Sequence, residues 1–244
     1  MTELLYQLDS YLKTFEAVVT GLDEDARGVI LDRTAFYPGG GGQPADAGSL
    51  TLLEDGQETT LPVTRAKKAG PEVVHYLGGE GPLPQVGARV RGALDWERRF
   101  QLMRTHTAMH VLCGVIFRDY GASVTGGDMD PLKGRMDFEF ETMQRELVDQ
   151  IQEAVNREVE NDRPVKVAIL PREEAFAIPD LIRTKINLLP EGIQQVRVVE
   201  IAGLDLQADG GTHVSRTGEV GRIRVVDYKS KGKINKRIYI EVEN

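Results

Sequence analysis

The sequence predicts an α+β protein with two domains, a small β domain in residues 1–94 and an α+β domain in residues 95–244. Two observations predict this. Residues 3–94 hold short apolar stretches separated by turn-forming residues, a pattern typical of strands. At Asp95 the apolar spacing changes to three and four, which is typical of a helix, and helical and strand-like segments are mixed from there on.

Six strands are expected in the first domain, at residues 4–8, 16–22, 27–33, 60–66, 72–77 and 89–95. Strands of this length and spacing favour a small β-barrel or a sandwich. His75 lies in the fifth strand between Val and Tyr. We interpret it as a half-buried strand residue without a partner.

A glycine-rich segment, TAFYPGGGGQPADAG at residues 34–48, interrupts these strands. Its four consecutive glycines predict either a flexible turn or a loop whose backbone amides approach a ligand closely. Phe36, Tyr37, Gln43 and Asp46 give the loop a polar rim with stackable rings. The segment lacks the Lys-Ser/Thr ending of a phosphate-binding P-loop and the glycine spacing of a dinucleotide-binding turn.

Residues 96–120 are predicted to form a helix, with Asp95 as its N-cap and Gly121 as its C-cap. Cys113 lies on this helix among Val and Leu side chains. We interpret it as a buried, inert thiol, because three ligands along one straight helix converge poorly on one ion.

The remaining elements follow from the same patterns. A turn is expected at Gly126 and Gly127, and a sharp GGTH turn at residues 210–213. Helices are expected at residues 143–161 and 173–177. Strands are expected at residues 134–140, 165–170, 195–201, 219–228 and 235–242.

Two histidines four residues apart, His106 and His110, are expected on one face of the long helix, where both imidazoles can reach one metal ion. Thr107 stands where a zincin protease needs its glutamate, so that class is disfavoured. Taken alone, the pair is better explained as a satisfied helix face. Asp209 and His213, brought together by the glycine turn, would complete a tetrahedral nitrogen and oxygen shell suited to zinc.

Composition is that of an ordinary globular chain, with 244 residues, 28% charged residues and a net charge of −8. The single cysteine excludes an internal disulfide. The absence of a long apolar run or a signal-like start predicts a cytoplasmic protein. One basic cluster near the C-terminus can meet phosphate, although taken alone it is better explained as a solvated strand end; it consists of Lys229, Lys231, Lys233, Lys236 and Arg237.

The motifs HTAMH (residues 106–110), GRMDF (134–138), DGGTHVSRTGEVG (209–221) and KGKINKRIYI (231–240), preceded by FYPGGGGQPADAG (36–48), occur in this order. Together they resemble the editing domain of alanyl-tRNA synthetase and its free-standing relatives, the AlaX proteins of the medium-length type. The resemblance implies an N-terminal β-barrel that carries the glycine-rich loop. It also implies an α+β editing domain of the threonyl/alanyl-tRNA synthetase second additional domain type.

The resemblance implies an aminoacyl-tRNA deacylase with one Zn²⁺ per chain. Its metal ligands match His106, His110 and His213, while Asp209 stands where the family has a cysteine. A carboxylate binds zinc but lacks the softness of a thiolate. By the resemblance, the candidates for substrate binding in the glycine-rich loop are Thr34, Gly39, Gly40, Gly41, Gly42 and Gln43, and Thr107 and Thr125 are further candidates to line the cavity. Gln207 is a candidate to support or replace a metal ligand, and it is also counted among the expected substrate-binding residues. The basic cluster is the expected tRNA-binding surface.

The expected substrate is alanine-specific tRNA mischarged with serine, with glycine as a second candidate. Met109 stands where many synthetase editing domains have Thr, which bears on this selectivity. A covalent intermediate is disfavoured because no Ser-His-Asp or Cys-His arrangement is evident. Two alternatives remain: a non-catalytic, metal-stabilised tRNA-binding module, and a deacylase for another mischarged tRNA such as threonine tRNA carrying serine.

Overall fold

A computed structural model describes residues 1–54, 57–184, 189 and 192–243. The chain divides into two compact units. The first consists of Met1–Gly40 and Pro44–Phe100, and the second of Gly41–Gln43 and Gln101–Asn244. Three residues of the glycine-rich loop therefore group with the second unit, and the predicted boundary after residue 94 remains a prediction.

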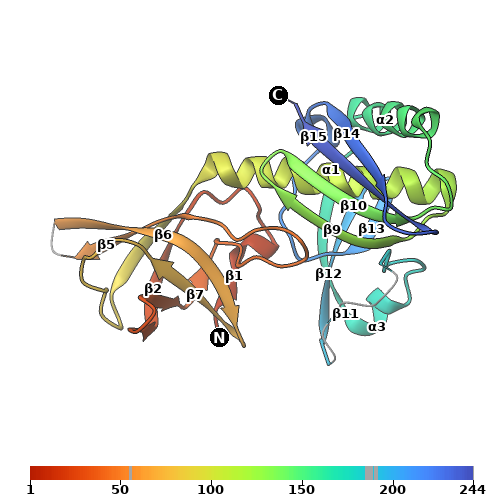
Figure 1. Cartoon of the computed structure of the whole chain (residues 1–244). Coiled ribbons are helices and arrows are strands. Elements are labelled where there is room, and N and C mark those ends of the chain that lie inside the picture. Colours follow the sequence, from red (N-terminus) through yellow and green to blue (C-terminus); the bar gives the residue numbers. More distant parts are fainter. Residues whose placement is uncertain (55–56, 185–188, 190–191, 244) are drawn as a thin grey trace. The chain divides into compact units, whose positions relative to one another are not determined.

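The first unit is a closed β-barrel with the strand order β2-β3-β7-β6-β5-β8, so the barrel alternative is confirmed (Figure 1). Its strands are β2 (Thr14–Asp23), β3 (Gly28–Leu31), β5 (Gly48–Glu54), β6 (Gln57–Ala69), β7 (Glu72–Leu77) and β8 (Arg89–Leu94). Alternate residues of β2, including Ala17 and Val19, point into the barrel while their neighbours are exposed. The inward-pointing residues of the strands form one apolar core inside the closed barrel.

Two predictions in the barrel unit were wrong. The stretch at residues 4–8 is mainly a 3-10 helix, η1 (Leu5–Gln7), after the two-residue strand β1 (Glu3–Leu4), which pairs with β4 (Arg33–Thr34). The apolar run there is packed on the barrel core by Leu4 and Leu5 and needs no long strand. Strand β5 was not predicted, because its run GSLTLLE lacks a clean alternation.

His75 is fully buried and has two partners, which corrects its interpretation as a half-buried residue without one. Its Nε2 lies 2.8 Å from Thr34 Oγ1, and its Nδ1 lies 3.0 Å from the Val29 carbonyl oxygen. Burial lowers the pKa of His75 to about 4, against a smaller raising effect of the Val29 hydrogen bond. The ring is therefore neutral in the folded barrel at neutral pH.

A buried ion pair ties the glycine-rich segment to the start of α1 (Trp96–Tyr120) within the first unit. Arg99 donates from Nε to Asp46 Oδ2 at 2.9 Å and from Nη1 to the Ser10 carbonyl at 3.0 Å. Asp46 also accepts the Tyr37 backbone N–H at 2.6 Å. These contacts hold together the two ends of the segment that contains the four glycines.

The second unit contains most of α1 and the four-stranded sheet β14-β15-β10-β9 (Figure 1). The predicted caps of α1 are confirmed: Asp95 Oδ1 accepts the Arg98 N–H at 3.2 Å, and Gly121 ends the helix with a φ of +65°. Residues 102–116 of α1 are all buried, polar ones included. A helix buried on all sides can carry polar groups only where they have partners, which makes its histidines candidates for a site.

Gly126 and Gly127 lie inside strand β9 (Val124–Asp130), so the predicted turn at these residues was wrong. A Cβ on Gly127 would come within 3.2 Å of Met109 Cε, and one on Gly134 of β10 (Lys133–Glu139) within 3.0 Å of Met109 Sδ. The glycines therefore leave room for the Met109 side chain of α1 against the sheet. Met109 is a buried packing residue.

The other elements of the second unit lie close to their predicted positions. Helix α2 (Arg145–Glu160) packs beside β14 (Ile223–Ser230), where Asn156 Nδ2 donates to the Ile223 carbonyl. The predicted strand at residues 219–228 begins later, because residues up to Val220 belong to the 3-10 helix η2 (Thr217–Val220). The unit is completed by β15 (Asn235–Val242), by the three-stranded sheet of β11 (Val165–Pro171), β12 (Gln195–Ile201) and β13 (Asp205–Ala208), and by α3 (Arg172–Phe176). Of the helices in the described ranges, none has both the length and the apolarity of a membrane span.

Replacing His75 with Gln should remove a pH-dependent contribution to barrel stability. The folded ring takes up a proton only near pH 4, whereas the unfolded ring does so near 6.5. Its stabilisation is therefore complete above pH 6.5 and is lost as the pH falls towards 4, by up to about 3 kcal/mol. Urea unfolding followed by fluorescence of Trp96, the only tryptophan, measures this. Parallel pH profiles for both proteins would contradict the assignment.

Candidate functional site

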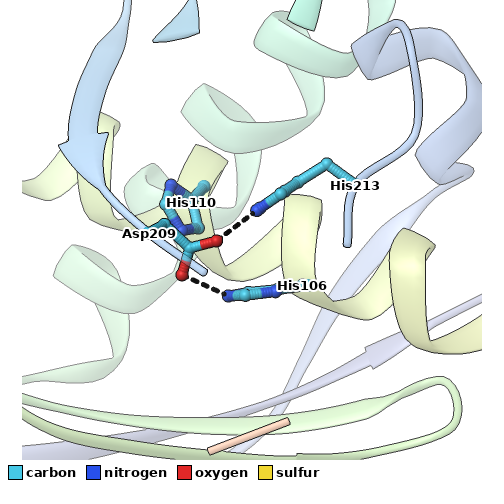
Figure 2. A group of neighbouring side chains, drawn as sticks. All are labelled: His106, His110, Asp209 and His213. Carbon is cyan, nitrogen blue, oxygen red and sulfur yellow. Dashed lines mark hydrogen bonds and ion pairs between the residues drawn. The ribbon is translucent and has the colours of Figure 1, made fainter. Parts of the chain in front are cut away.

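Four side chains from two distant parts of the sequence converge in the second unit (Figure 2). His106 and His110 come from one face of α1, and Asp209 and His213 from the segment that follows β13. One ligand atom from each lies within 4.8 Å of the others. The structure thus brings together all four residues that the sequence predicts as metal ligands.

The spacing of these atoms suits a small divalent ion. Asp209 Oδ1 lies 3.5 Å from His106 Nε2, and Asp209 Oδ2 lies 3.0 Å from His213 Nε2. Zinc bonds of ~2.0–2.1 Å in a tetrahedral shell place ligand atoms roughly 3.4 Å apart. The imidazole rings of His106 and His213 are stacked with centroids 4.3 Å apart, and their Nε2 atoms both lie near the Asp209 carboxylate.

Each of the three imidazoles has a polar partner at Nδ1, which leaves Nε2 directed at the shared centre. His106 Nδ1 donates to Gln43 Oε1 at 2.9 Å, and His110 Nδ1 donates to Asp205 Oδ2 at 3.0 Å. His213 Nδ1 lies 3.1 Å from Thr107 Oγ1. Partners at the outer nitrogen fix both the tautomer and the ring orientation of a histidine ligand.

Sequence reasoning missed Asp205, although it contacts a predicted ligand. Its side chain is fully buried, and Oδ2 accepts hydrogen bonds from both His110 and Gln207 Nε2, the latter at 2.7 Å. The available signal was its place in DLQAD: four residues before Asp209, it lies at the start of the short strand that leads into the site. From the sequence alone, a single Asp at that position is explained equally well as a turn residue.

Gln43 reaches the site from the glycine-rich loop. Its Oε1 accepts both His106 Nδ1–H and the Thr212 backbone N–H, and its Nε2 donates to Thr212 Oγ1 at 2.9 Å. Gly39, Gly40, Gly41 and Gly42 all have φ between +57° and +132°, a region that side chains disfavour. The four glycines are therefore required by the path of the backbone, and the Gly42 carbonyl accepts the Met129 N–H at 3.1 Å.

Burial sets the protonation of the site. It lowers the pKa of His213 to about 4 and that of His106 well below its ordinary value. Burial alone would raise the pKa of Asp209, but the imidazoles beside it outweigh this and hold it well below its ordinary value. Burial would also lower the pKa of His110, but its hydrogen bond to Asp205 and the charges of Asp205 and Asp209 outweigh this and raise it. A metal cation binds the neutral imidazole and the ionised carboxylate, so metal binding competes with protonation of His110.

The predicted substrate-binding residues other than the four glycines and Gln43 lie in several different parts of the structure. Thr34 lies in the barrel unit against His75, while Thr125 is exposed and donates to Asn235 Oδ1. Thr107 is buried beside His213 and accepts the Val214 N–H. Gln207 contacts Asp205 and donates to Cys113 Sγ at 3.3 Å. Their roles in substrate binding remain predictions.

Cys113 is buried, as predicted. Burial raises the pKa of its thiol, and the nearby Asp205 raises it further. The thiol is therefore protonated at neutral pH.

In the basic cluster near the C-terminus, three of the five charges have partners. Lys229 pairs with Asp227, and Arg237 makes two hydrogen bonds to Asp137 at 2.6 and 2.7 Å. Lys236 is buried, and its Nζ donates to two carbonyl oxygens of the preceding turn. Lys231 and Lys233 are exposed.

Comparison with known proteins defines the class first. Residues 196–239, which include Asp209 and His213, match the family described as threonyl and alanyl tRNA synthetase second additional domain. Residues 6–98 match class II (A) tRNA synthetases. A segment of the alanine–tRNA ligase of Ignicoccus hospitalis is 38% identical to 92% of this chain, which covers 24% of that protein.

Full-length relatives narrow this class. The alanyl-tRNA editing protein AlaX-M of Methanosarcina acetivorans is 40% identical, with 98% of each chain covered. That of Saccharolobus solfataricus is 41% identical, with 100% of each covered. The chain belongs to the AlaX-M family of alanyl-tRNA editing proteins, which are deacylating hydrolases, and the resemblance seen in the sequence is confirmed.

Replacing Gly211 with Ala should damage the centre, whereas the same change at Gly210 should not. A Cβ on Gly211 would lie 2.3 Å from His106 Cε1 and 2.6 Å from Gln43 Oε1, while one on Gly210 meets nothing within 4 Å. Moving His106 should weaken zinc binding about tenfold or more. Competition with a chromophoric chelator measures this affinity. Equal affinities for the two variants would show that Gly211 does not set the ring position.

Proposed function

We propose that this chain is a zinc-dependent editing hydrolase that deacylates alanine tRNA mischarged with serine, and also with glycine. The observation that carries the proposal is the cluster of His106, His110, Asp209 and His213 in an AlaX-M family member. Three imidazole nitrogens and one carboxylate oxygen are donors that suit a zinc ion. Because its substrate is an aminoacyl-tRNA, the proposal places the protein in the cytoplasm.

Zinc is supported by the chemistry of the donors. Imidazole nitrogen suits zinc, and the carboxylate of Asp209 bonds at nearly the same length as imidazole. Asp209 is itself held by the Gly211 N–H at 2.8 Å and lies 3.6 Å from Arg197 Nη1. These contacts draw charge away from the carboxylate, so zinc affinity should be lower than for a thiolate at this position.

In the proposed enzyme, side chains of this protein orient the three imidazoles that would hold zinc. When bound, zinc supplies a Lewis acid that can polarise an ester carbonyl or lower the pKa of a water molecule. Gln43, Asp205 and Thr107 fix the three imidazoles, so the site is organised before substrate arrives. Cys113 is unsuited to attack the ester, because its thiol is buried and its pKa is raised. Direct hydrolysis is therefore favoured over a covalent intermediate.

Two alternatives have specific observations behind them. Asp209 in the place of the family cysteine is compatible with a non-catalytic tRNA-binding module. The match to a domain shared with threonyl-tRNA synthetase is compatible with a deacylase for threonine tRNA carrying serine. Exposed Lys231 and Lys233 are the members of the basic cluster best placed to meet tRNA phosphates in any of these cases.

Release of labelled serine from seryl-tRNA specific for alanine tests the proposal. The purified protein should release serine, a chelator should abolish the release, and added zinc should restore it. Alanyl-tRNA should be spared, because a site that bonds the serine hydroxyl discriminates against its absence. The variant His110→Ala should lose at least about 100-fold in rate, since it removes a metal ligand.

Three other outcomes would contradict the proposal or change its substrate. Salt-dependent tRNA binding without release of serine under any added metal would contradict the proposal and support the binding module. Faster release from threonine tRNA than from alanine tRNA would transfer the activity to the other substrate. Full activity of His110→Ala would exclude the metal centre as the site of hydrolysis.

A further inference from the structure

A polar cluster built on the buried Asp205 contacts Nδ1 of His110. It consists of Asp205, Gln207 and Arg183. Asp205 Oδ2 accepts from His110 Nδ1 at 3.0 Å and from Gln207 Nε2 at 2.7 Å, and Asp205 Oδ1 lies 3.6 Å from Arg183 Nε. The side chain of Asp205 is wholly buried, and that of Arg183 is 11% exposed.

Arg183 comes from the segment between α3 and β12. Its guanidinium lies 3.7 Å from the centroid of the Phe117 ring on α1, seven residues after His110. Phe117 thus holds the cation against the helix that carries the ligand. The Arg183 carbonyl also accepts the Val124 N–H at 3.1 Å, which ties this segment to β9.

A buried carboxylate is costly unless a positive charge balances it. Asp205 would otherwise bring an uncompensated charge into the interior, and Arg183 is the arginine that forms an ion pair with it. A carboxylate that accepts the outer N–H of a histidine strengthens that imidazole as a metal ligand and fixes its orientation. Of the three imidazoles, only that of His110 has a carboxylate at its Nδ1, since His106 has an amide and His213 a hydroxyl.

We propose that Asp205 is the positioning residue for His110 and that Arg183 provides the charge that allows a carboxylate to stand there. Gln207 lies on the same strand as Asp205, β13, and its Nε2 donates to Asp205 Oδ2, the oxygen that also accepts from His110. Gln207 therefore helps to fix the Asp205 side chain. This inference rests on the metal centre proposed above. It adds a dependence of metal affinity on residues that do not touch the metal.

Zinc affinity of four proteins tests the inference, by competition with a chromophoric chelator. They are wild type, Asp205→Asn, the double variant Asp205→Asn/Arg183→Met, and the control Asp137→Asn. Asp137 is also a largely buried carboxylate paired with an arginine, and both of its carboxylate oxygens accept from that residue, Arg237, on the neighbouring strand β15. The double variant leaves no unpaired buried charge, so it should fold even where Asp205→Asn does not.

We expect Asp205→Asn and the double variant to bind zinc about 10–100-fold more weakly than wild type. Asp137→Asn should keep the wild-type affinity, which separates positioning from a general loss of a buried pair. Circular dichroism confirms folding of each metal-free protein. Serine release should recover in the double variant at saturating zinc, because the metal ligands themselves are intact.

Wild-type zinc affinity in the folded double variant would overturn the inference while leaving the metal centre in place. A comparable loss in Asp137→Asn would also overturn it. If the wild-type protein itself bound no zinc, the metal centre would fall and the inference with it. The wild-type measurement therefore distinguishes the two failures.

Discussion

The structure of the second unit depends on one constraint: three imidazole rings must point the same nitrogen at one centre. A histidine has two chemically similar nitrogens, and a ring left without an outer partner can rotate or take the wrong tautomer. Here an amide, a carboxylate and a hydroxyl, from Gln43, Asp205 and Thr107, occupy the three Nδ1 positions. Each comes from a different stretch of the chain, so the centre exists only when these stretches are assembled.

This constraint explains features that otherwise look unrelated. Four consecutive glycines with positive φ carry Gln43 to His106, and Gly211 leaves the space that His106 occupies. The glycines of β9 and β10 serve a different need, since they admit Met109 and let the buried helix α1 lie close to its sheet. At Gly127, Gly134 and Gly211 the missing side chain thus leaves room for a large side chain to lie against the backbone.

The fold could be predicted where the sequence carries a strong local signal. The period of two gave the positions of most barrel strands, and Asp95 and Gly121 marked both ends of α1 correctly. Prediction failed where tertiary packing overrides local preference. Gly126 and Gly127 look like a turn but lie in a strand because Met109 packs against them, and residues 4–8 look like a strand but form a 3-10 turn.

The candidate site divides in the same way. The grouping of its four candidate ligands was predictable, because histidine spacing and a glycine turn are chemical signals in a short stretch of sequence. Asp205 was not predictable, because a carboxylate whose only role is to hold another side chain has no distinctive spacing. Gln43 was predicted to bind substrate, which remains a prediction, but nothing in the sequence indicates that its amide also contacts His106 and Thr212.

X-ray absorption of the zinc-loaded protein tests the central claim most directly, because it reports the atoms bound to the metal. The account predicts three imidazole nitrogens and oxygen donors at about 2.0–2.2 Å, with no sulfur. Fewer than three imidazoles, or a sulfur at about 2.3 Å from Cys113, would contradict it. Either result would mean that the arrangement of Nδ1 partners does not define the metal centre.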